Sequence, residues 1–240
     1  MSMSNITNAI RKVLPLGRCG AVIVAAGNAS RMGGIDKVMA QLEGEPMIAR
    51  TVRAFQEAIA ISEIVIVTRP DLIEPIRKLC EGYDKVTAVV SGGSSRQESV
   101  GLGLAALSDK CKLAAIQDGA RPLISQAVID RTVRAAHSYG AAAPAIPVKD
   151  TIKVVKGGVV DHTPDRSSLM AIQTPQVFDF DLIRGALKKA ELEDWAVTDD
   201  CSAVELMGMS VKIVEGDERN IKVTTPLDLA IAKLLLEEEK

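Results

Sequence analysis

Short apolar runs rich in Val and Ile alternate along the chain with longer segments whose apolar positions recur at helical spacing. The short runs predict strands at residues 21–25, 63–68, 85–90, 113–117, 141–147 and 211–215. The longer segments predict helices at residues 47–60, 71–81, 95–107, 125–138, 179–190, 199–207 and 226–238, and we expect Asp71 to cap the second of them. The alternation predicts an α/β fold with a Rossmann-like, mostly parallel sheet and helices on both faces.

One segment, from Val148 to Gln173, breaks this alternation. Two Val-rich stretches flank Gly157 and Gly158 there, a pattern typical of a β-hairpin. A hairpin this short is only marginally stable alone, so it should rest on another surface. We therefore predict a single domain over residues 1–240, from which residues 148–173 protrude as a β-hairpin arm that mediates dimerisation. A surface ribbon folded onto its own domain is the alternative.

Composition excludes several classes of function. The 240 residues carry a formal net charge of −2, which gives no general attraction to nucleic acid or to an anionic membrane. Three Phe, two Tyr and one Trp are too few for a base-stacking platform. The four cysteines form no Cys-x-x-Cys pair and the two histidines are far apart, so neither a zinc site nor a disulfide framework is indicated. Without an apolar run long enough to span a bilayer, we expect a soluble, cytoplasmic protein.

The segment between Ala21 and Lys37 carries the first candidate chemistry. Its apolar run ends in Ala25, Ala26 and Gly27, and the cations Arg31 and Lys37 follow. Glycine permits a sharp turn and close approach of the backbone to a ligand, and cations beside backbone N–H groups suit a polyphosphate. The segment matches neither the Walker loop nor the dinucleotide fingerprint. A plain strand-to-helix connection with two solvated cations is the alternative.

Three further loops follow predicted strands, at the edge where open α/β sheets bind their ligands. One contains Gly93, Ser94 and Ser99, which also fit a turn before a serine-capped helix. Asp118 follows the fourth strand and could hold Mg²⁺ together with phosphate oxygens, although an Asp there more often caps a loop. Lys222 follows the last strand and could reach an anion, or it could belong to an exposed charged loop.

One more carboxylate pair stands outside these loops. Asp199 and Asp200 open the helix predicted at 199–207, and Thr198 precedes them. The two carboxylates could face a metal, but capping of the helix is the simpler interpretation.

Taken in order, these motifs resemble the cytidylyltransferase family that makes 4-diphosphocytidyl-2-C-methyl-D-erythritol in the non-mevalonate isoprenoid pathway. The resemblance extends from Ala21 to about Leu236. It rests on Ala25-Ala-Gly-x-x-x-Arg31, Lys37, Gly92-Gly-x-x-Arg96-x-x-Ser99, Asp118-x-Ala-Arg121-Pro, Pro147-Val-Lys-Asp-Thr151, Asp165-Arg166, Thr174-Pro-Gln176, Thr198-Asp199 and Asn220-Ile-Lys222. It implies transfer of CMP from CTP to methylerythritol phosphate, with release of pyrophosphate, by a homodimer that uses Mg²⁺.

The resemblance also implies roles for single residues. Arg31 and Lys37 would stabilise charge on the triphosphate, and Asp118 would hold Mg²⁺. Arg166 and Lys222 would position the acceptor phosphate. The substrate-binding residues would be Ala25, Ala26, Gly27, Gly93, Ser94, Ser99, Thr198 and, from an arm that crosses to a second subunit, Thr151. Aligning two anions is most of the catalytic task, so no general base is required of the protein.

Two alternatives stay open at this point. The acceptor could be another polyol phosphate such as ribitol 5-phosphate, because the nucleotide half of the site would look nearly the same. The chain could instead be a non-catalytic nucleotide-binding or scaffold protein, which would show no turnover. Ala29, Asp36 and Gly119 depart from residues common in the family, but none of these departures removes a charged group with an implied role.

Overall fold

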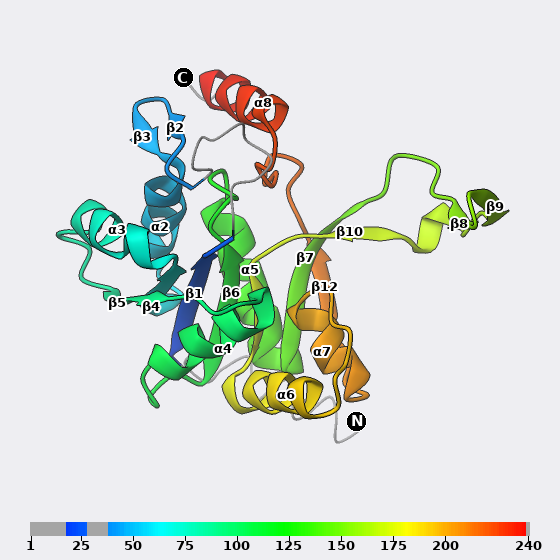
Figure 1. Cartoon of the computed structure of the whole chain (residues 1–240), viewed down its shortest axis with the longest axis horizontal. Helices are drawn as coiled ribbons and strands as arrows, with labels where there is room; N and C mark the ends of the chain where they lie inside the picture. The colour runs from blue at the N-terminus through cyan, green and yellow to red at the C-terminus, as the bar shows by residue number, and fades with distance from the viewer. Residues whose placement is uncertain (1–17, 28–37, 239–240) are drawn as a thin grey trace, which may run out of the picture.

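The computed structural model describes residues 18–27 and 38–238, and Figure 1 shows a central sheet with helices on both sides and an arm that projects from one edge. The strand order is β10-β7-β11-β6-β1-β4-β5, and β12 also pairs with β7. The strands are β1 (Cys19–Ala25), β4 (Ile61–Thr68), β5 (Val86–Ser91), β6 (Leu113–Asp118), β7 (Ala141–Pro147), β10 (Met170–Ile172), β11 (Gln176–Asp179) and β12 (Lys212–Glu215). The predicted fold class is confirmed.

The central strands β1, β4 and β6 are parallel and largely buried, which explains the long apolar runs in their sequences. In β1, Ala21 and Ile23 face one helical layer and Val22 faces the other. The first layer contains α2 (Met47–Glu57), α3 (Ile73–Leu79) and α5 (Gln126–Tyr139). The second contains α4 (Arg96–Ala106), α6 (Phe180–Leu192) and α7 (Asp200–Leu206).

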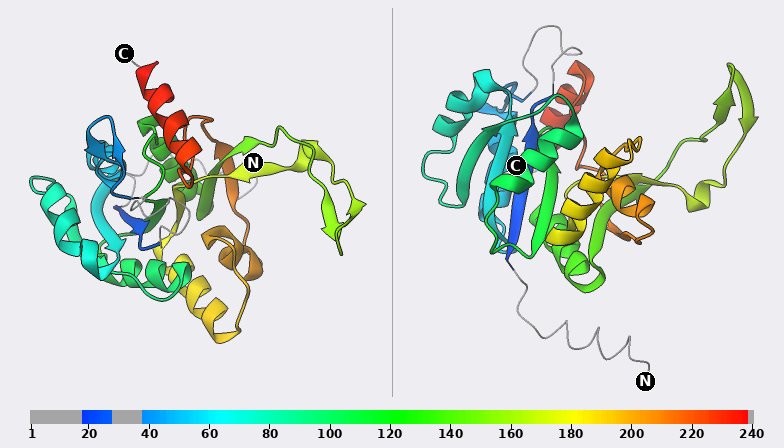
Figure 2. Two further views of the ribbon diagram at one scale, coloured as in Figure 1. Left: turned by 45° about the horizontal axis from the view of Figure 1, so that its top comes forward. Right: turned by 60° about the horizontal axis from the view of Figure 1, so that its bottom comes forward.

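A smaller apolar cluster lies beyond the carboxyl edge of the sheet. There α8 (Pro226–Glu237) packs near the short hairpin of β2 (Gln41–Leu42) and β3 (Glu45–Pro46), and Leu42, Met47 and Leu236 are buried together. Figure 2 shows α8, the red helix, in two further views. Within residues 18–27 and 38–238, no helix is both long and apolar enough to cross a membrane.

Most predicted elements are present with shifted ends, and a few predictions are wrong. The helix predicted at 71–81 begins instead as a 3-10 turn, Pro70–Leu72, and only then becomes α3. Asp71 does not cap it, because its carboxylate pairs with Arg69 at 3.1 Å. The first predicted helix ends at Glu57, since the backbone of Ala58 is extended. The antiparallel strands β10 and β11 and the β2–β3 hairpin were not predicted.

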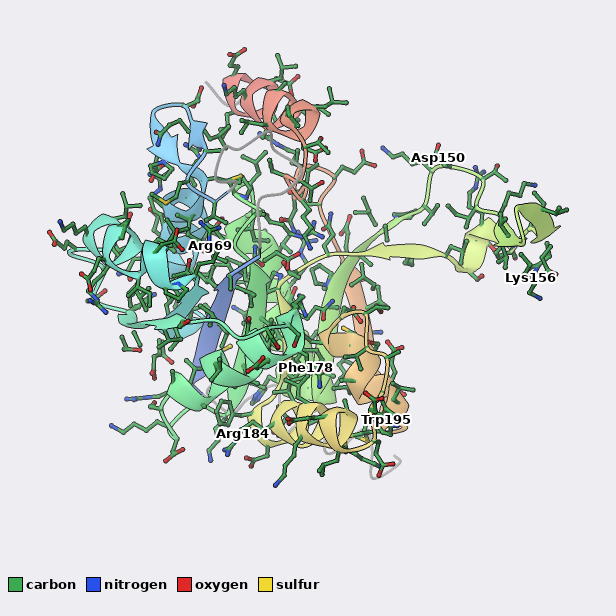
Figure 3. All side chains as sticks on the ribbon, in the orientation of Figure 1. Arg69, Asp150, Lys156, Phe178, Arg184 and Trp195 are labelled. Carbon is green, nitrogen blue, oxygen red and sulfur yellow. The ribbon has the colours of Figure 1, made fainter. Side chains whose placement is uncertain are left out.

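The predicted hairpin arm is present. Strands β8 (Val154–Lys156) and β9 (Val159–His162) pair around Gly157 and Gly158, both of which have positive φ angles, at 56° and 81°. Figures 1 and 2 show the arm reaching away from the sheet, and Figure 3 places Lys156 far from the central Phe178. Three valines of the hairpin, Val155, Val159 and Val160, are exposed, Val159 to 71%. The alternative of a ribbon folded onto its own domain does not match this arrangement.

Candidate active site

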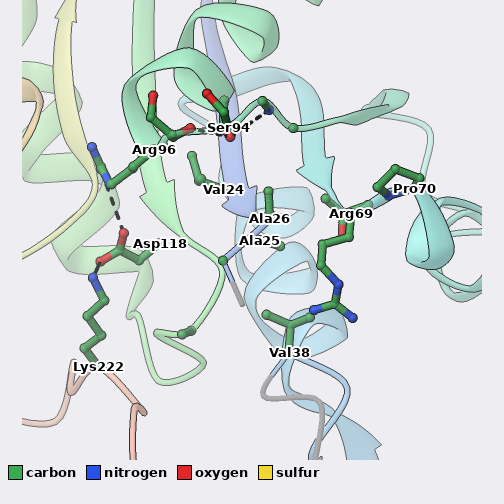
Figure 4. A pocket seen from close by; sticks show the side chains of 17 residues that line it. Val24, Ala25, Ala26, Val38, Arg69, Pro70, Ser94, Arg96, Asp118 and Lys222 are labelled. Atoms are coloured by element: carbon green, nitrogen blue, oxygen red, sulfur yellow. Dashed lines mark hydrogen bonds and ion pairs between the residues drawn. The ribbon is translucent and has the colours of Figure 1, made fainter. Parts of the chain in front are cut away.

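A pocket of about 430 Å³ lies at the carboxyl edge of the sheet, where β1, β4, β5 and β6 end (Figure 4). Parallel strands end at one edge, so loops far apart in the sequence meet there. Predicted site residues that line this pocket are Ala25, Ala26, Gly27, Gly93, Ser94, Ser99, Asp118 and Lys222. In Figure 4, Asp118 and Lys222 lie at one end of the pocket, and Arg69 and Pro70 lie at the other.

Small residues form the wall between these two ends. A Cβ atom on Gly92 would lie 2.4 Å from the Cβ of Ala26 and 2.9 Å from Oγ of Ser99, so a side chain at position 92 would push the two loops apart. The Ser99 hydroxyl accepts a hydrogen bond from the backbone N–H of Gly93 at 3.1 Å. The turn is thus held by its own side chains, and it presents a backbone surface to the pocket.

Ser95 shows that the loop after β5 is both a turn before a serine-capped helix and part of the pocket, the two interpretations that the sequence allowed. Its side chain caps α4 by accepting from the backbone N–H of Glu98 at 3.0 Å, as a serine-capped helix requires. The same turn lines the pocket. The cap therefore fixes the start of α4 against the pocket, and with it the direction in which Arg96 leaves the helix.

Asp118, the last residue of β6, is buried among three cations. Its Oδ2 lies 2.9 Å from Nζ of Lys222 and 3.5 Å from Nε of Arg121, and its Oδ1 lies 3.8 Å from Nη2 of Arg96. Its backbone N–H donates to Oγ1 of Thr174 at 3.1 Å. Burial by itself raises the pKa of Asp118, but the cations, Lys222 foremost, hold the pKa below its usual value. The carboxylate is therefore held in its ionised form.

Arg121 and Asn220 hold the loop that carries Lys222. The Arg121 guanidinium donates to the backbone carbonyl of Asn220 at 2.6 Å. The Asn220 side chain in turn donates to the carbonyl of Thr174 at 2.9 Å. Arg121 thus both faces Asp118 and braces the loop that brings Lys222 to it.

Arg96 is a residue of this site to which the sequence assigned no role. It is the first residue of α4, lines the pocket, and donates from Nη2 to Oδ2 of Asp200 at 2.7 Å. The signal that could have found it is a cation in the first turn of the predicted helix, close behind the Gly92-Gly93 turn. Asp199, in contrast, caps α7 by accepting from the N–H of Ser202, as predicted.

Three further predicted residues, Thr151, Arg166 and Thr198, are described by the structure and do not line this pocket. Thr151 and Arg166 lie on the arm, where they are exposed, and Arg166 donates to the carbonyl of Lys149 at 2.9 Å. Thr198 is exposed beside the start of α7, close in sequence to the partner of Arg96. Arg31 and Lys37 lie outside the described residues.

The described residues contain no group of three or more His, Cys, Asp or Glu side chains arranged to hold a metal ion. Mg²⁺ in phosphate-handling enzymes is commonly held by one or two carboxylates together with the phosphates of the substrate. A single ionised carboxylate that faces a pocket of nucleotide size, as Asp118 does, fits that kind of site.

The topology and the pocket together define a class: the chain is an α/β nucleotidyltransferase. The sequence model of the 2-C-methyl-D-erythritol 4-phosphate cytidylyltransferase family matches residues 19–238. Relatives of that name are 41% identical in Alkaliphilus oremlandii, over 94% of this chain and 98% of the relative, and 45% identical in Caldanaerobacter subterraneus, over 90% and 97%.

A solved structure of 4-diphosphocytidyl-2C-methyl-D-erythritol synthase from Anaerococcus prevotii superposes with a TM-score of 0.84 at 32% identity, covering 92% of this chain and 96% of that one. The chain therefore belongs to the 2-C-methyl-D-erythritol 4-phosphate cytidylyltransferase family. Its function is that of the family, cytidylyl transfer in isoprenoid biosynthesis. The predicted family, enzyme class and function are confirmed, and a non-catalytic scaffold is disfavoured.

Proposed function

We propose that the pocket at the carboxyl edge binds CTP, and that the phosphate of 2-C-methyl-D-erythritol 4-phosphate attacks its α-phosphorus there in line, with pyrophosphate as the leaving group. The observation that carries this proposal is the gathering of three cations around the ionised Asp118 at one end of a pocket, next to a wall of backbone and small side chains. Such a pocket has a charged end for phosphates and an uncharged wall for a base.

The wall of small residues suits the base and ribose of the nucleotide. Ala25 is the last residue of β1, Ala26 and Gly27 follow it, and Gly93 and the serines of the neighbouring turn line the same pocket. Their backbone groups can read the edge of a pyrimidine, because no bulky side chain stands between the base and the backbone. Ser94 and Ser99 add hydroxyl groups at the same wall.

The charged end suits the reacting phosphates. Asp118 would hold Mg²⁺, which when bound supplies a template and Lewis-acid stabilisation for phosphate oxygens. Lys222 would orient the acceptor phosphate, and Arg31 and Lys37 would offset charge on the triphosphate. Two anions repel one another, so cations that hold both in line supply most of what the reaction needs from the protein.

The arm would complete the site of a second subunit in a homodimer. Thr151 and Arg166 lie on the arm and do not line the pocket of their own chain, while the exposed valines of the hairpin offer an apolar surface. In a dimer with two-fold symmetry, each arm can deliver its residues to the pocket of the partner. These observations support a functional dimer.

A pyrophosphate-release assay tests the reaction. CTP, UTP, ATP and GTP are each offered with methylerythritol phosphate or ribitol 5-phosphate, with and without Mg²⁺. We expect turnover only with CTP, methylerythritol phosphate and Mg²⁺ together. Asp118→Asn should lower kcat on the order of 10²–10³-fold, whereas the exposed Asp109→Asn should leave kcat unchanged. Equal turnover without Mg²⁺, or with ribitol 5-phosphate, would contradict the assignment.

Mixing two inactive variants tests the arm. Arg166→Ala and Lys222→Ala are each expected to be inactive as pure proteins. In a mixed dimer, one pocket has its own Lys222 and receives the intact Arg166 from its partner. Co-refolding equal amounts should therefore restore about a quarter of the wild-type activity per subunit. If each subunit uses its own Arg166, mixing restores nothing.

A further inference from the structure

Asp200 is a buried carboxylate that the proposed reaction does not use. Its side chain is 1% exposed, and its partner is Arg96, 104 positions earlier in the chain, at 2.7 Å. A carboxylate taken out of water needs strong compensation, since burial disfavours its charged form. Asp200 therefore calls for an explanation beyond the cap of α7, which Asp199 already supplies.

Arg96 links this buried carboxylate to the pocket. The same Nη2 atom that donates to Asp200 lies 3.8 Å from Oδ1 of Asp118. Lys222 and Arg121 both face the other oxygen, Oδ2. The cations are thus divided between the two oxygens of Asp118, and Arg96 is the cation on the Oδ1 side.

Rigid contacts hold Asp200 in place. The side-chain carbonyl of Gln176 accepts from the backbone N–H groups of Asp200 and Cys201, both at 3.1 Å. The amide nitrogen of Gln176 donates to Asp199 at 2.7 Å. The first turn of α7 is therefore fastened to the start of β11, and Asp200 gives Arg96 a fixed anchor.

We infer that Asp200 is a positioning residue, which anchors Arg96 so that its guanidinium faces Oδ1 of Asp118 without closing onto it. This inference rests on the proposed role of Asp118. Without its anchor, Arg96 would move toward Asp118 and form a direct pair with it. The 3.8 Å separation between Nη2 of Arg96 and Oδ1 would then close to hydrogen-bond distance, and Asp118 would no longer have the orientation that the phosphates require.

The test measures kcat and KM separately. A displacement of about 1 Å at a reacting group can cost on the order of 100-fold in rate, so Asp200→Asn should lower kcat by that order. The KM for CTP should change little, because the base wall of β1 and the Gly92-Gly93 turn is untouched. Asp179→Asn removes an exposed carboxylate that caps α6, and it serves as the charge-matched control with an unchanged kcat.

A double variant tests whether Asp200 acts through Arg96. If it does, then Asp200→Asn should have no further effect on kcat in an Arg96→Gln background. If Asp200 acts independently of Arg96, the losses of the two single variants multiply, which would overturn the inference. So would a wild-type kcat for Asp200→Asn, provided the wild-type enzyme itself releases pyrophosphate.

Arg96→Lys keeps the test decisive if Asp200→Asn fails to fold. Lysine preserves the charge that Asp200 needs, but its flexible ammonium lacks the fixed planar geometry that sets Nη2 of Arg96 between the two carboxylates. We expect a folded protein with kcat lowered at least 10-fold. A wild-type kcat for Arg96→Lys would overturn the inference, whereas a wild-type enzyme without any turnover would overturn the proposed function instead.

Discussion

Replacing Gly103 with alanine should destabilise the protein, although alanine is the better helix former. Gly103 is buried in the middle of α4, where the helix lies directly on β1 and β4. A Cβ built at this position would lie 2.3 Å from Cγ1 of Val22 and 2.8 Å from Cγ2 of Val67. Carbon atoms in van der Waals contact are about 3.5–4.0 Å apart, so the helix or the two valines would have to move.

The magnitude follows from two opposing effects. Overpacking of this kind costs about 1–3 kcal/mol, and the severe overlap with Val22 points to the upper end of that range. Alanine returns about 1 kcal/mol of helix propensity. We expect a net loss of about 2 kcal/mol in the free energy of unfolding, or a decrease in Tm of about 4–8 °C for a chain of this size.

Gly101 provides the matched control in the same helix. A Cβ there would meet nothing within 4 Å, so Gly101→Ala should raise the free energy of unfolding by about 0.5–1 kcal/mol. Urea denaturation followed by circular dichroism measures both variants. The reasoning fails if the two substitutions shift stability in the same direction, because propensity would then outweigh the contact with the sheet.

Gly103→Ala should also alter the geometry of the active site. The first turn of α4 carries Arg96 and Ser99, so lifting the helix from the sheet moves both relative to the pocket. We expect Gly103→Ala to lower kcat/KM for CTP while Gly101→Ala leaves it unchanged.

Two further predictions concern stability. Gln117 is fully buried in β6, and neither of its amide atoms has a hydrogen-bond partner among the residues that the structure describes. Gln117→Met should therefore raise the free energy of unfolding by about 1 kcal/mol in urea titrations; an unchanged or lower value would contradict this. Burial raises the pKa of Asp228, but hydrogen bonds from Thr224 and Thr225 outweigh burial and hold the pKa below its usual value. The stabilisation is therefore complete above the unfolded pKa of about 4 and is lost as the pH falls through the folded pKa. The stability difference between wild type and Asp228→Asn should shrink on acidification, and a difference that persists at low pH would refute the assignment.

The central strands could be predicted because burial on both faces requires apolar residues along most of their length. Strand β1 is covered by helices on both faces, so Ala21, Val22 and Ile23 are all apolar, and the strand ends at Ala25, two residues before Gly27. The same holds for β4, which begins two residues earlier than predicted, at Ile61. The fold class also predicted that ligands bind at the edge where these strands end. The meeting of Ala25, Asp118 and Lys222 in one pocket could therefore be predicted as well.

Short antiparallel strands could not be predicted in this way. Strand β10 has three residues, all exposed, and β11 has four, so neither shows a run or an alternation long enough to recognise. Their pairing with β7 is set by contacts between distant segments. The arm was predictable for the opposite reason, because two glycines between Val-rich stretches are a local signal.

The pair of Asp199 and Asp200 shows where local reasoning reaches its limit. Both are carboxylates at the start of a helix, and capping explained both equally well from the sequence. A cap needs only the backbone of its own first turn, and Asp199 has that interaction with Ser202. The partner of Asp200 lies on α4, and the two meet because α4, α6 and α7 share one face of the sheet. Sequence reasoning assigns a local role, here helix capping, to a side chain whose true partner is distant in the chain. Unexpected site residues should therefore be sought among buried charged side chains whose expected local interaction is already made by a neighbour.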